Sequence, residues 1–299
     1  MEYGQGAPSG GAIRITHVDA AGTRIAVHRA GAGRAVVCLH AIGHGARDYY
    51  DLMRRLGGRY DIVAVDWPGH GDSPADTQPA SADRYTAILS DLLRHLDLGE
   101  VVLIGNSVGG AVAIKIAAVT PEAVRGLVLC DPAGLQRVGL VARLFCRWKA
   151  RFFAAGERGD PGFARRFRRY YERQVLPEPA ASARREQIIA AGYQAAAALR
   201  QGWESFGRPS ADIRSLTSGL QCPVLYAWAR NDRLIALSRC RAAVVATPYH
   251  DLMLFDAGHC AFLEQPDAFE AALRTFLGKV QPADSRRASR MTTEDQASA

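Results

Sequence analysis

The chain has 299 residues, of which 48% are hydrophobic and 22% charged, and its formal net charge is +7. The apolar content excludes an intrinsically disordered protein, and the 29 glycines and 14 prolines follow no period, which excludes a collagen-like sequence. The longest apolar run, residues 101–119, is interrupted by Asn106, Ser107 and Lys115, so we expect no membrane span. The six cysteines lack metal-binding spacing, and no apolar signal segment stands at the N-terminus, so we expect a reduced, cytoplasmic protein.

Short apolar runs alternate with amphipathic stretches along most of the chain. In chain order, we expect strands at residues 12–18, 24–28, 35–40, 62–67, 101–104, 124–130, 223–228 and 252–255. We expect helices at residues 82–96, 108–118, 238–246 and from Pro266 to near Gly278. The runs from the third strand to the sixth show little alternation, as in strands buried on both faces of a parallel sheet. The pattern predicts an α/β fold, a mostly parallel central sheet flanked by helices.

Residues 133–220 interrupt this alternation. They contain no strong strand-like run, are rich in Arg, Ala and aromatic residues, and are broken at Pro161, Pro177 and Pro179. We predict that they form a helical cap, inserted after the sixth strand over one edge of a core made of residues 12–132 and 221–280. Residues 1–11 and 281–299 are polar, and we expect both to be disordered.

The positive charge is concentrated in the predicted cap. Between Arg137 and Arg185, 13 Arg and Lys residues stand against four acidic residues, a net of +9, which leaves +7 − 9 = −2 for the rest. The favoured interpretation is an amphipathic helix whose arginines are solvated and whose aromatic stripe is buried. The stripe consists of Phe163, Phe167, Tyr170 and Tyr171.

Two other interpretations of the basic residues stay open. One or two arginines, with Arg168 as a candidate, could bind a carboxylate or phosphate of an anionic substrate, because a guanidinium matches such groups with two parallel hydrogen bonds. An anionic partner, such as a carrier protein or a membrane surface, is the third interpretation. We expect no nucleic-acid partner, because no nucleic-acid-binding motif accompanies the basic residues.

The sequence around Ser107 carries the clearest chemical signal. Residues 105–109 read Gly-Asn-Ser-Val-Gly, which fits G-x-S-x-G directly after a buried strand and directly before a helix. A serine on such a tight turn projects its hydroxyl above the sheet, where it can act as a nucleophile. The alternative interpretation of the motif is an incidental Ser-Gly turn without a chemical role. The N–H of Val108 would stand at a helix N-terminus, where an oxyanion is stabilised. We therefore predict that Ser107 is a nucleophile.

A serine nucleophile needs a base, and the base needs an acid that orients it. His259 follows the last expected strand and Asp232 follows the preceding one, so the chain order is Ser, Asp, His. We predict His259 as the base and Asp232 as the acid. Asp131, which ends the sixth expected strand, is the alternative acid, although Asp before Pro132 is also an ordinary turn residue.

Over residues 13–280 the chain resembles the α/β-hydrolase family. The matching stretches are residues 39–43, 66–73 and 105–110, the loop at Asp232, and Gly258-His259. The resemblance makes the N–H of Ile42 the second oxyanion donor beside that of Val108. His40, His44 and His70 lie in these loops, where hydrogen bonds that fix loop shape are the favoured interpretation. A direct catalytic role is the alternative for these three histidines, and we also consider contacts with substrate for His40 and Asn106.

Serine at the turn, where haloalkane dehalogenases and epoxide hydrolases of this family have Asp, argues for acyl chemistry. We expect hydrolysis of an ester or thioester of a small to medium acyl substrate through an acyl-enzyme, with no cofactor and no metal. The sequence around Ser107 is also similar to that of meta-cleavage-product hydrolases, so C–C bond hydrolysis of a vinylogous keto acid is the second alternative. A non-catalytic, ligand-binding member of the fold is the third.

Overall fold

The computed structural model describes residues 12–280, so both predicted disordered tails lie outside the described residues. Its centre is an eight-stranded sheet with the order β1-β2-β4-β3-β5-β6-β7-β8. The strands are β1 (Arg14–Ala20), β2 (Thr23–Ala30), β3 (Arg34–Leu39), β4 (Tyr60–Val65), β5 (Val101–Asn106), β6 (Val124–Cys130), β7 (Val224–Ala229) and β8 (His250–Phe255). β2 pairs antiparallel with β1 and β4, and every other pair is parallel. The predicted α/β fold with a mostly parallel sheet is confirmed.

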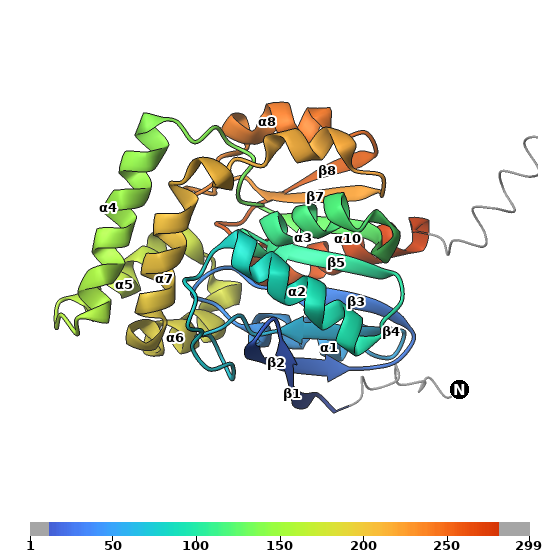
Figure 1. Ribbon diagram of the computed structural model, residues 1–299, viewed down its shortest axis with the longest axis horizontal. Helices are drawn as coiled ribbons and strands as arrows, with labels where there is room; N and C mark the ends of the chain where they lie inside the picture. Colours follow the sequence, from blue (N-terminus) through green and yellow to red (C-terminus); the bar gives the residue numbers. More distant parts are fainter. Residues whose placement is uncertain (1–11, 281–299) are drawn as a thin grey trace, which may run out of the picture.

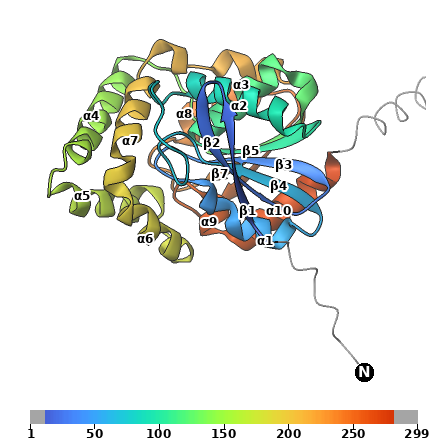
Figure 2. The same cartoon turned by 60° about the horizontal axis from the view of Figure 1, so that its bottom comes forward.

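Helices cover both faces of the sheet. α2 (Ala82–Leu96), α3 (Val108–Val119) and α8 (Leu237–Ala246) lie on one face, and α1 (Tyr50–Leu56), α9 (Ala261–Glu264) and α10 (Pro266–Lys279) lie on the other (Figure 2). Two short 3-10 helices, η1 (Ala46–Tyr49) and η2 (Pro121–Ala123), complete this part. No helix among residues 12–280 is long and apolar enough to cross a bilayer.

The segment between β6 and β7 is helical and gathers at one end of the sheet (Figure 1). It contains α4 (Leu140–Glu157), α5 (Phe163–Tyr170), α6 (Ser182–Ala190) and α7 (Gly192–Phe206), the π-helix η3 (Tyr171–Val175), and the 3-10 helices η4 (Pro179–Ala181), η5 (Pro209–Ala211) and η6 (Arg214–Gly219). α4 and α7 pack side by side (Figure 1). The predicted aromatic stripe on α5 and η3 is buried throughout. This burial attaches the basic helix to its neighbours and leaves its arginines outside.

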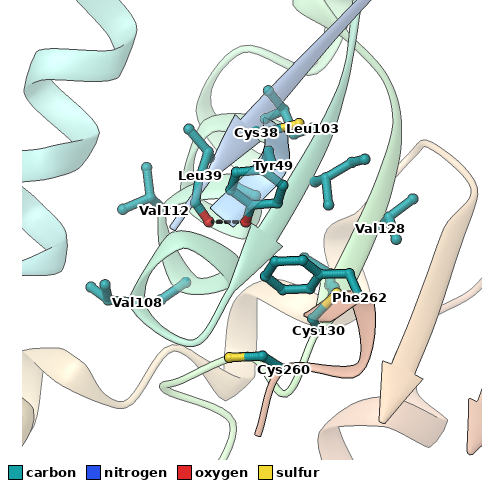
Figure 3. Packing of buried hydrophobic residues seen from close by; sticks show 14 of the residues in the cluster. Cys38, Leu39, Tyr49, Leu103, Val108, Val112, Val128, Cys130, Cys260 and Phe262 are labelled. Atoms are coloured by element: carbon teal, nitrogen blue, oxygen red, sulfur yellow. Dashed lines mark hydrogen bonds between the residues drawn. The ribbon is translucent and has the colours of Figure 1, made fainter. Parts of the chain in front are cut away.

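The buried core extends up to the carboxyl ends of the strands. There, the Tyr49 hydroxyl donates to the carbonyl oxygen of Leu39 at 2.9 Å, and its ring stacks on that of Phe262 with 4.8 Å between centroids (Figure 3). Cys130 and Cys260 pack close by. These contacts hold the end of β3 against α9, so the loops that follow several strands have a rigid base.

Candidate active site

Ser107 lies on the tight turn between β5 and α3. Its backbone has φ 54° and ψ −115°, and a positive φ is rare for a residue with a side chain. The Ser107 N–H donates to the Cys130 carbonyl at 3.0 Å, and the Ser107 carbonyl accepts from the N–H groups of Ala111 (3.1 Å) and Ala133 (2.9 Å). Strand, turn and helix therefore follow each other as the G-x-S-x-G spacing predicts.

Three glycines around this turn allow the chain segments to approach closely. A Cβ at Gly105 would lie 2.4 Å from the Gly109 carbonyl oxygen. One at Gly109 would lie 2.1 Å from the Leu39 carbonyl oxygen. One at Gly110 would lie 2.7 Å from the Cβ of Pro132. Since real Cβ atoms essentially never come within 3.0 Å of such neighbours, α3 begins directly against β3 and the loop after β6 only because these residues are glycines.

His259 and Asp232 follow β8 and β7, and their side chains face each other. Nδ1 of His259 lies 2.7 Å from Oδ2 of Asp232, and both side chains are buried. The second oxygen of Asp232, Oδ1, accepts the main-chain N–H groups of Leu234 (2.6 Å) and Ile235 (3.0 Å). The carboxylate is thereby fixed to accept from Nδ1–H, an orientation that leaves Nε2 unprotonated and able to accept a proton.

A cavity of about 110 Å³ lies between the sheet and the helices that follow β6. Ser107, His259 and Ile42 line it from the core side. The opposite wall is mostly apolar and includes Val138, Ala142, Phe145, Tyr170, Trp203 and Phe206. The structure therefore brings the predicted nucleophile and the predicted base, far apart in sequence, to one apolar cavity.

The alpha/beta hydrolase family model matches residues 36–272, a range that holds Ser107, Asp232 and His259. The chain belongs to the α/β-hydrolase family. A pimeloyl-[acyl-carrier protein] methyl ester esterase from Xanthomonas oryzae is 28% identical over 84% of this chain and 97% of its own length. A thermophilic esterase from Thermogutta terrifontis has a solved structure with a TM-score of 0.76 at 22% identity, covering 90% of this chain and 100% of that chain.

A further relative is longer than this α/β-hydrolase. The dihydrolipoyllysine-residue acetyltransferase component of the acetoin cleaving system of Pseudomonas putida is 29% identical over 83% of this chain. The match spans 64% of that relative's length. The family and its esterase relatives together support a hydrolase.

Asp131, the alternative acid of this α/β-hydrolase, lies next to Asp232. One side-chain atom from each of Asp131, Asp232 and His259 falls within 4.8 Å of the others. Oδ1 of Asp131 accepts the Ala229 N–H at 2.9 Å, whereas Oδ2 meets no N–H or O–H group of residues 12–280. Burial and the charge of Asp232 raise the pKa of Asp131 well above its usual range. Asp232 contacts Nδ1 of His259 directly, whereas no hydrogen bond joins Asp131 to the imidazole among the described residues, and this difference favours Asp232 as the acid that orients the ring.

Asn106 connects the turn at Ser107 to the histidine loop. Its Nδ2 donates to the carbonyl oxygens of Cys130 and His259, at 3.0 Å each, and its Oδ1 accepts from the Cys260 thiol at 3.1 Å. The side chain is fully buried, and its hydrogen bonds all remain within the protein. This position does not support the substrate contact considered for Asn106 and instead indicates that it positions the two loops.

Glu264 was not among the residues predicted for the site, yet it holds the histidine loop. Its Oε2 accepts three consecutive main-chain N–H groups, from Gly258 (2.9 Å), His259 (3.1 Å) and Cys260 (3.2 Å). Its Oε1 accepts the N–H of Glu178 at 3.2 Å. Burial raises the pKa of Glu264 in spite of these bonds. The sequence signal that could have indicated Glu264 is an acidic residue directly after the apolar residues 261–263, close to the predicted base.

The two predicted oxyanion donors have free N–H groups. Val108 is the first residue of α3, so its N–H has no partner within the helix. Ile42 lies in the loop after β3, and its main-chain N–H donates to no residue among 12–280. Both therefore have a hydrogen bond available for a bound group.

His40 and His70 fix the loop that carries Ile42. Nε2 of His40 accepts the Trp67 N–H at 2.9 Å, and Nε2 of His70 accepts the Gly43 N–H at 2.9 Å. Burial lowers the pKa of His40 to about 3 and also lowers that of His70, so both rings are neutral acceptors. The substrate contact considered for His40 is not supported, because the ring is fully buried and bonded to the neighbouring loop.

His44 lines the cavity and belongs to a buried charged group. Its Nδ1 lies 2.7 Å from Oδ2 of Asp48, and Nε of Arg184 donates to Oδ1 of Asp48 at 2.6 Å. Burial alone would raise the pKa of Asp48, but the charges of His44 and Arg184 hold that pKa below its usual range. Since Arg184 belongs to α6, the buried carboxylate connects the helical segment to the core.

Arg168 lies outside the cavity. Its guanidinium pairs with Glu186 through two hydrogen bonds of 2.7 and 2.8 Å and lies 3.4 Å from Glu172, all on the exposed face of the helical segment. The substrate contact considered for Arg168 is therefore not supported. The cavity is instead lined by Arg208, which follows α7.

Proposed function

We propose that this α/β-hydrolase is a serine esterase that hydrolyses an ester or thioester of a small to medium acyl compound. One observation carries the proposal. A serine on a strained strand-to-helix turn and a histidine oriented by a buried aspartate line the same apolar cavity.

The reaction would begin with proton transfer from Ser107 to Nε2 of His259 as the serine oxygen attacks the acyl carbon. Asp232 stabilises the imidazolium that forms, through the 2.7 Å contact with Nδ1. The N–H groups of Ile42 and Val108 would donate to the oxyanion of the tetrahedral intermediate. Its collapse releases the alcohol or thiol, protonated by His259, and leaves an acyl-enzyme. Water deprotonated by His259 then attacks this ester and releases the acid.

The walls of the cavity support an acyl substrate. Val138, Phe145, Trp203 and Phe206 offer apolar surface to a hydrocarbon chain beside Ser107. The Xanthomonas oryzae relative is described as a methyl ester esterase, which agrees with an ester as substrate. All steps use side chains and main-chain N–H groups of this chain, so the proposed mechanism needs neither metal nor cofactor.

The proposal is tested with p-nitrophenyl esters from acetate to decanoate. We expect turnover by the wild type, a fall in kcat of about 10⁴-fold or more in Ser107→Ala, and no change in Ser238→Ala, which removes an exposed serine on α8. A fluorophosphonate probe should label the wild type but not Ser107→Ala. Unchanged ester turnover in Ser107→Ala would contradict the proposal. Cleavage of a meta-cleavage dienoate without any ester turnover would favour C–C bond hydrolysis instead.

A further inference from the structure

The solvent-facing side of α4 carries an apolar stripe. We use this name for five large side chains with exposed fractions between 37% and 78%: Leu140, Val141, Leu144, Phe145 and Trp148. α4 lies at the outer end of the helical segment in both views, away from the sheet (Figures 1 and 2). Residues at spacings of one, three and four share one side of a helix, so the five side chains form one continuous surface over more than two turns.

A row of arginines runs along one border of the apolar stripe. Arg143, Arg147 and Arg151 are four residues apart and exposed, so they follow one line along α4. Their guanidinium groups form no hydrogen bond or ion pair with any residue from 12 to 280. Glu157, the one acid within α4, pairs with Arg200 of α7. The row is therefore positive charge that the described part of the chain does not neutralise.

We propose that the apolar stripe and the arginine row of α4 dock this protein on an anionic lipid bilayer. A helix that lies in a bilayer interface has Trp, Phe and Leu on one face and basic residues beside them, as α4 has. The apolar side chains enter the region of the acyl chains, and the arginines meet phosphate oxygens, which a guanidinium binds with two parallel hydrogen bonds. Trp148 suits this boundary because its ring is apolar while its N–H can reach the headgroups.

Other occupants fit this surface less well. In an antiparallel pair of two copies, the stripes would meet, but the two arginine rows would face each other and repel. An acidic protein would neutralise the arginines, but it would need a groove that matches a protruding row of large side chains. A bilayer interface accepts such a row without a preformed groove.

The docking surface borders the cavity. Phe145 belongs to the apolar stripe and also lines the cavity, and Ala142 and Cys146 on the same helix line it as well. A docked α4 would place the cavity next to the bilayer, where acyl esters with long apolar parts partition. This last step rests on the proposed esterase function, whereas docking itself does not.

Vesicle binding tests the proposal without any activity measurement. Sucrose-loaded vesicles of phosphatidylcholine, with or without phosphatidylglycerol, are sedimented with the protein. We expect pelleting only with phosphatidylglycerol, and a decrease as salt is added. Val141→Glu should lower the bound-to-free ratio about tenfold or more, because it replaces an apolar contact with a charge that anionic lipid repels. Arg147→Glu should lower it about fivefold or more.

The matched control is Val119→Glu at the end of α3, since Val119 and Val141 are both 78% exposed. We expect Val119→Glu and Ser107→Ala to bind vesicles as the wild type does. Trp148 is 60% exposed, whereas the other three tryptophans are at most 8% exposed, so docking should shift the emission to shorter wavelength and Trp148→Phe should abolish the shift. No pelleting of the wild type, equal pelleting of Val141→Glu and its control Val119→Glu, or a dimer that Val141→Glu dissociates would overturn the proposal.

Discussion

Replacing Asp232 with asparagine should inactivate His259 without displacing it. Oδ1 of Asp232 accepts two main-chain N–H groups, at 2.6 and 3.0 Å, so the asparagine would keep its carbonyl oxygen at this position. Its NH₂ group would then face Nδ1 of His259 and donate to it, which moves the ring proton to Nε2. A protonated Nε2 cannot accept the proton of Ser107. We expect kcat to fall about 10⁴-fold, which corresponds to about 5.4 kcal/mol in the activation barrier.

Asp131→Asn is the matched control, because it makes the same chemical change at the neighbouring carboxyl group. Oδ1 of Asp131 accepts the Ala229 N–H at 2.9 Å, so the new NH₂ group takes the place of Oδ2. There, next to Asp232, it can donate to that carboxylate, so the contact between Asp232 and His259 is kept. Asparagine also tolerates the φ of 44° at this position. We expect kcat to stay within about threefold of the wild type.

The assay is steady-state hydrolysis of one p-nitrophenyl ester by the wild type and the two variants. Since Asp232→Asn changes a ring tautomer and not the cavity, we expect similar KM values and unchanged circular dichroism. A large loss of kcat in Asp131→Asn, with Asp232→Asn close to the wild type, would refute the reasoning. It would assign the orienting role to the carboxyl group after β6.

Three further predictions concern stability and the positioning of the loops around the site. Because burial and the charge of Asp232 raise the pKa of Asp131, the folded state keeps a proton that the unfolded chain releases above about pH 4, so wild-type stability falls as pH rises. The thermal midpoint of the wild type should therefore fall from about pH 5 to about pH 8 more than that of Asp131→Asn, which has no carboxyl group to titrate at this position; equal pH dependence would contradict this. Gly109→Ala places a Cβ 2.1 Å from the Leu39 oxygen and should lower the free energy of unfolding by about 1–3 kcal/mol or more in urea titrations. Gly219→Ala, with open space around it, should not. Asn106→Ala removes the bonds between the turn at Ser107 and the histidine loop and should lower kcat about 10–100-fold in the ester assay with little change in KM; a change confined to KM would speak against a positioning role.

The buried strands are predictable from the sequence because their environment is uniform. Every residue of β5 and of β7 is buried, so residues 101–104 of β5 and all of β7 form unbroken apolar runs. η1 and α1 are not predicted, because their sequences show no regular pattern of apolar residues. They are short, and the polar residues Asp48 and Asp51 fall within them, so no helical period develops between β3 and β4.

Which residues of the site can be predicted depends on whether the signal lies in neighbouring residues or in contacts between residues far apart in the sequence. Ser107 can be recognised from five adjacent residues, and His259 and Asp232 from chain order. The contact between Asn106 and the carbonyl of His259 joins residues 153 positions apart, and no local pattern encodes it. Likewise, the sequence shows many arginines between β6 and β7, but only the packing of α5 and α7 determines that Arg208 lines the cavity while Arg168 pairs on the surface.

The close contacts of the glycines around Ser107 also determine how this protein can be engineered. Gly105, Gly109 and Gly110 leave no room for even a methyl group, so libraries that vary these positions would consist mostly of inactive members. On the cavity wall from the helical segment, side chains such as Val138 and Phe145 face the cavity and can be exchanged for smaller or larger ones, whereas Gly134 has to stay because a Cβ there would lie 2.7 Å from Ile213. Diversity for a new substrate range therefore belongs in the segment between β6 and β7, with the turn at Ser107 kept invariant.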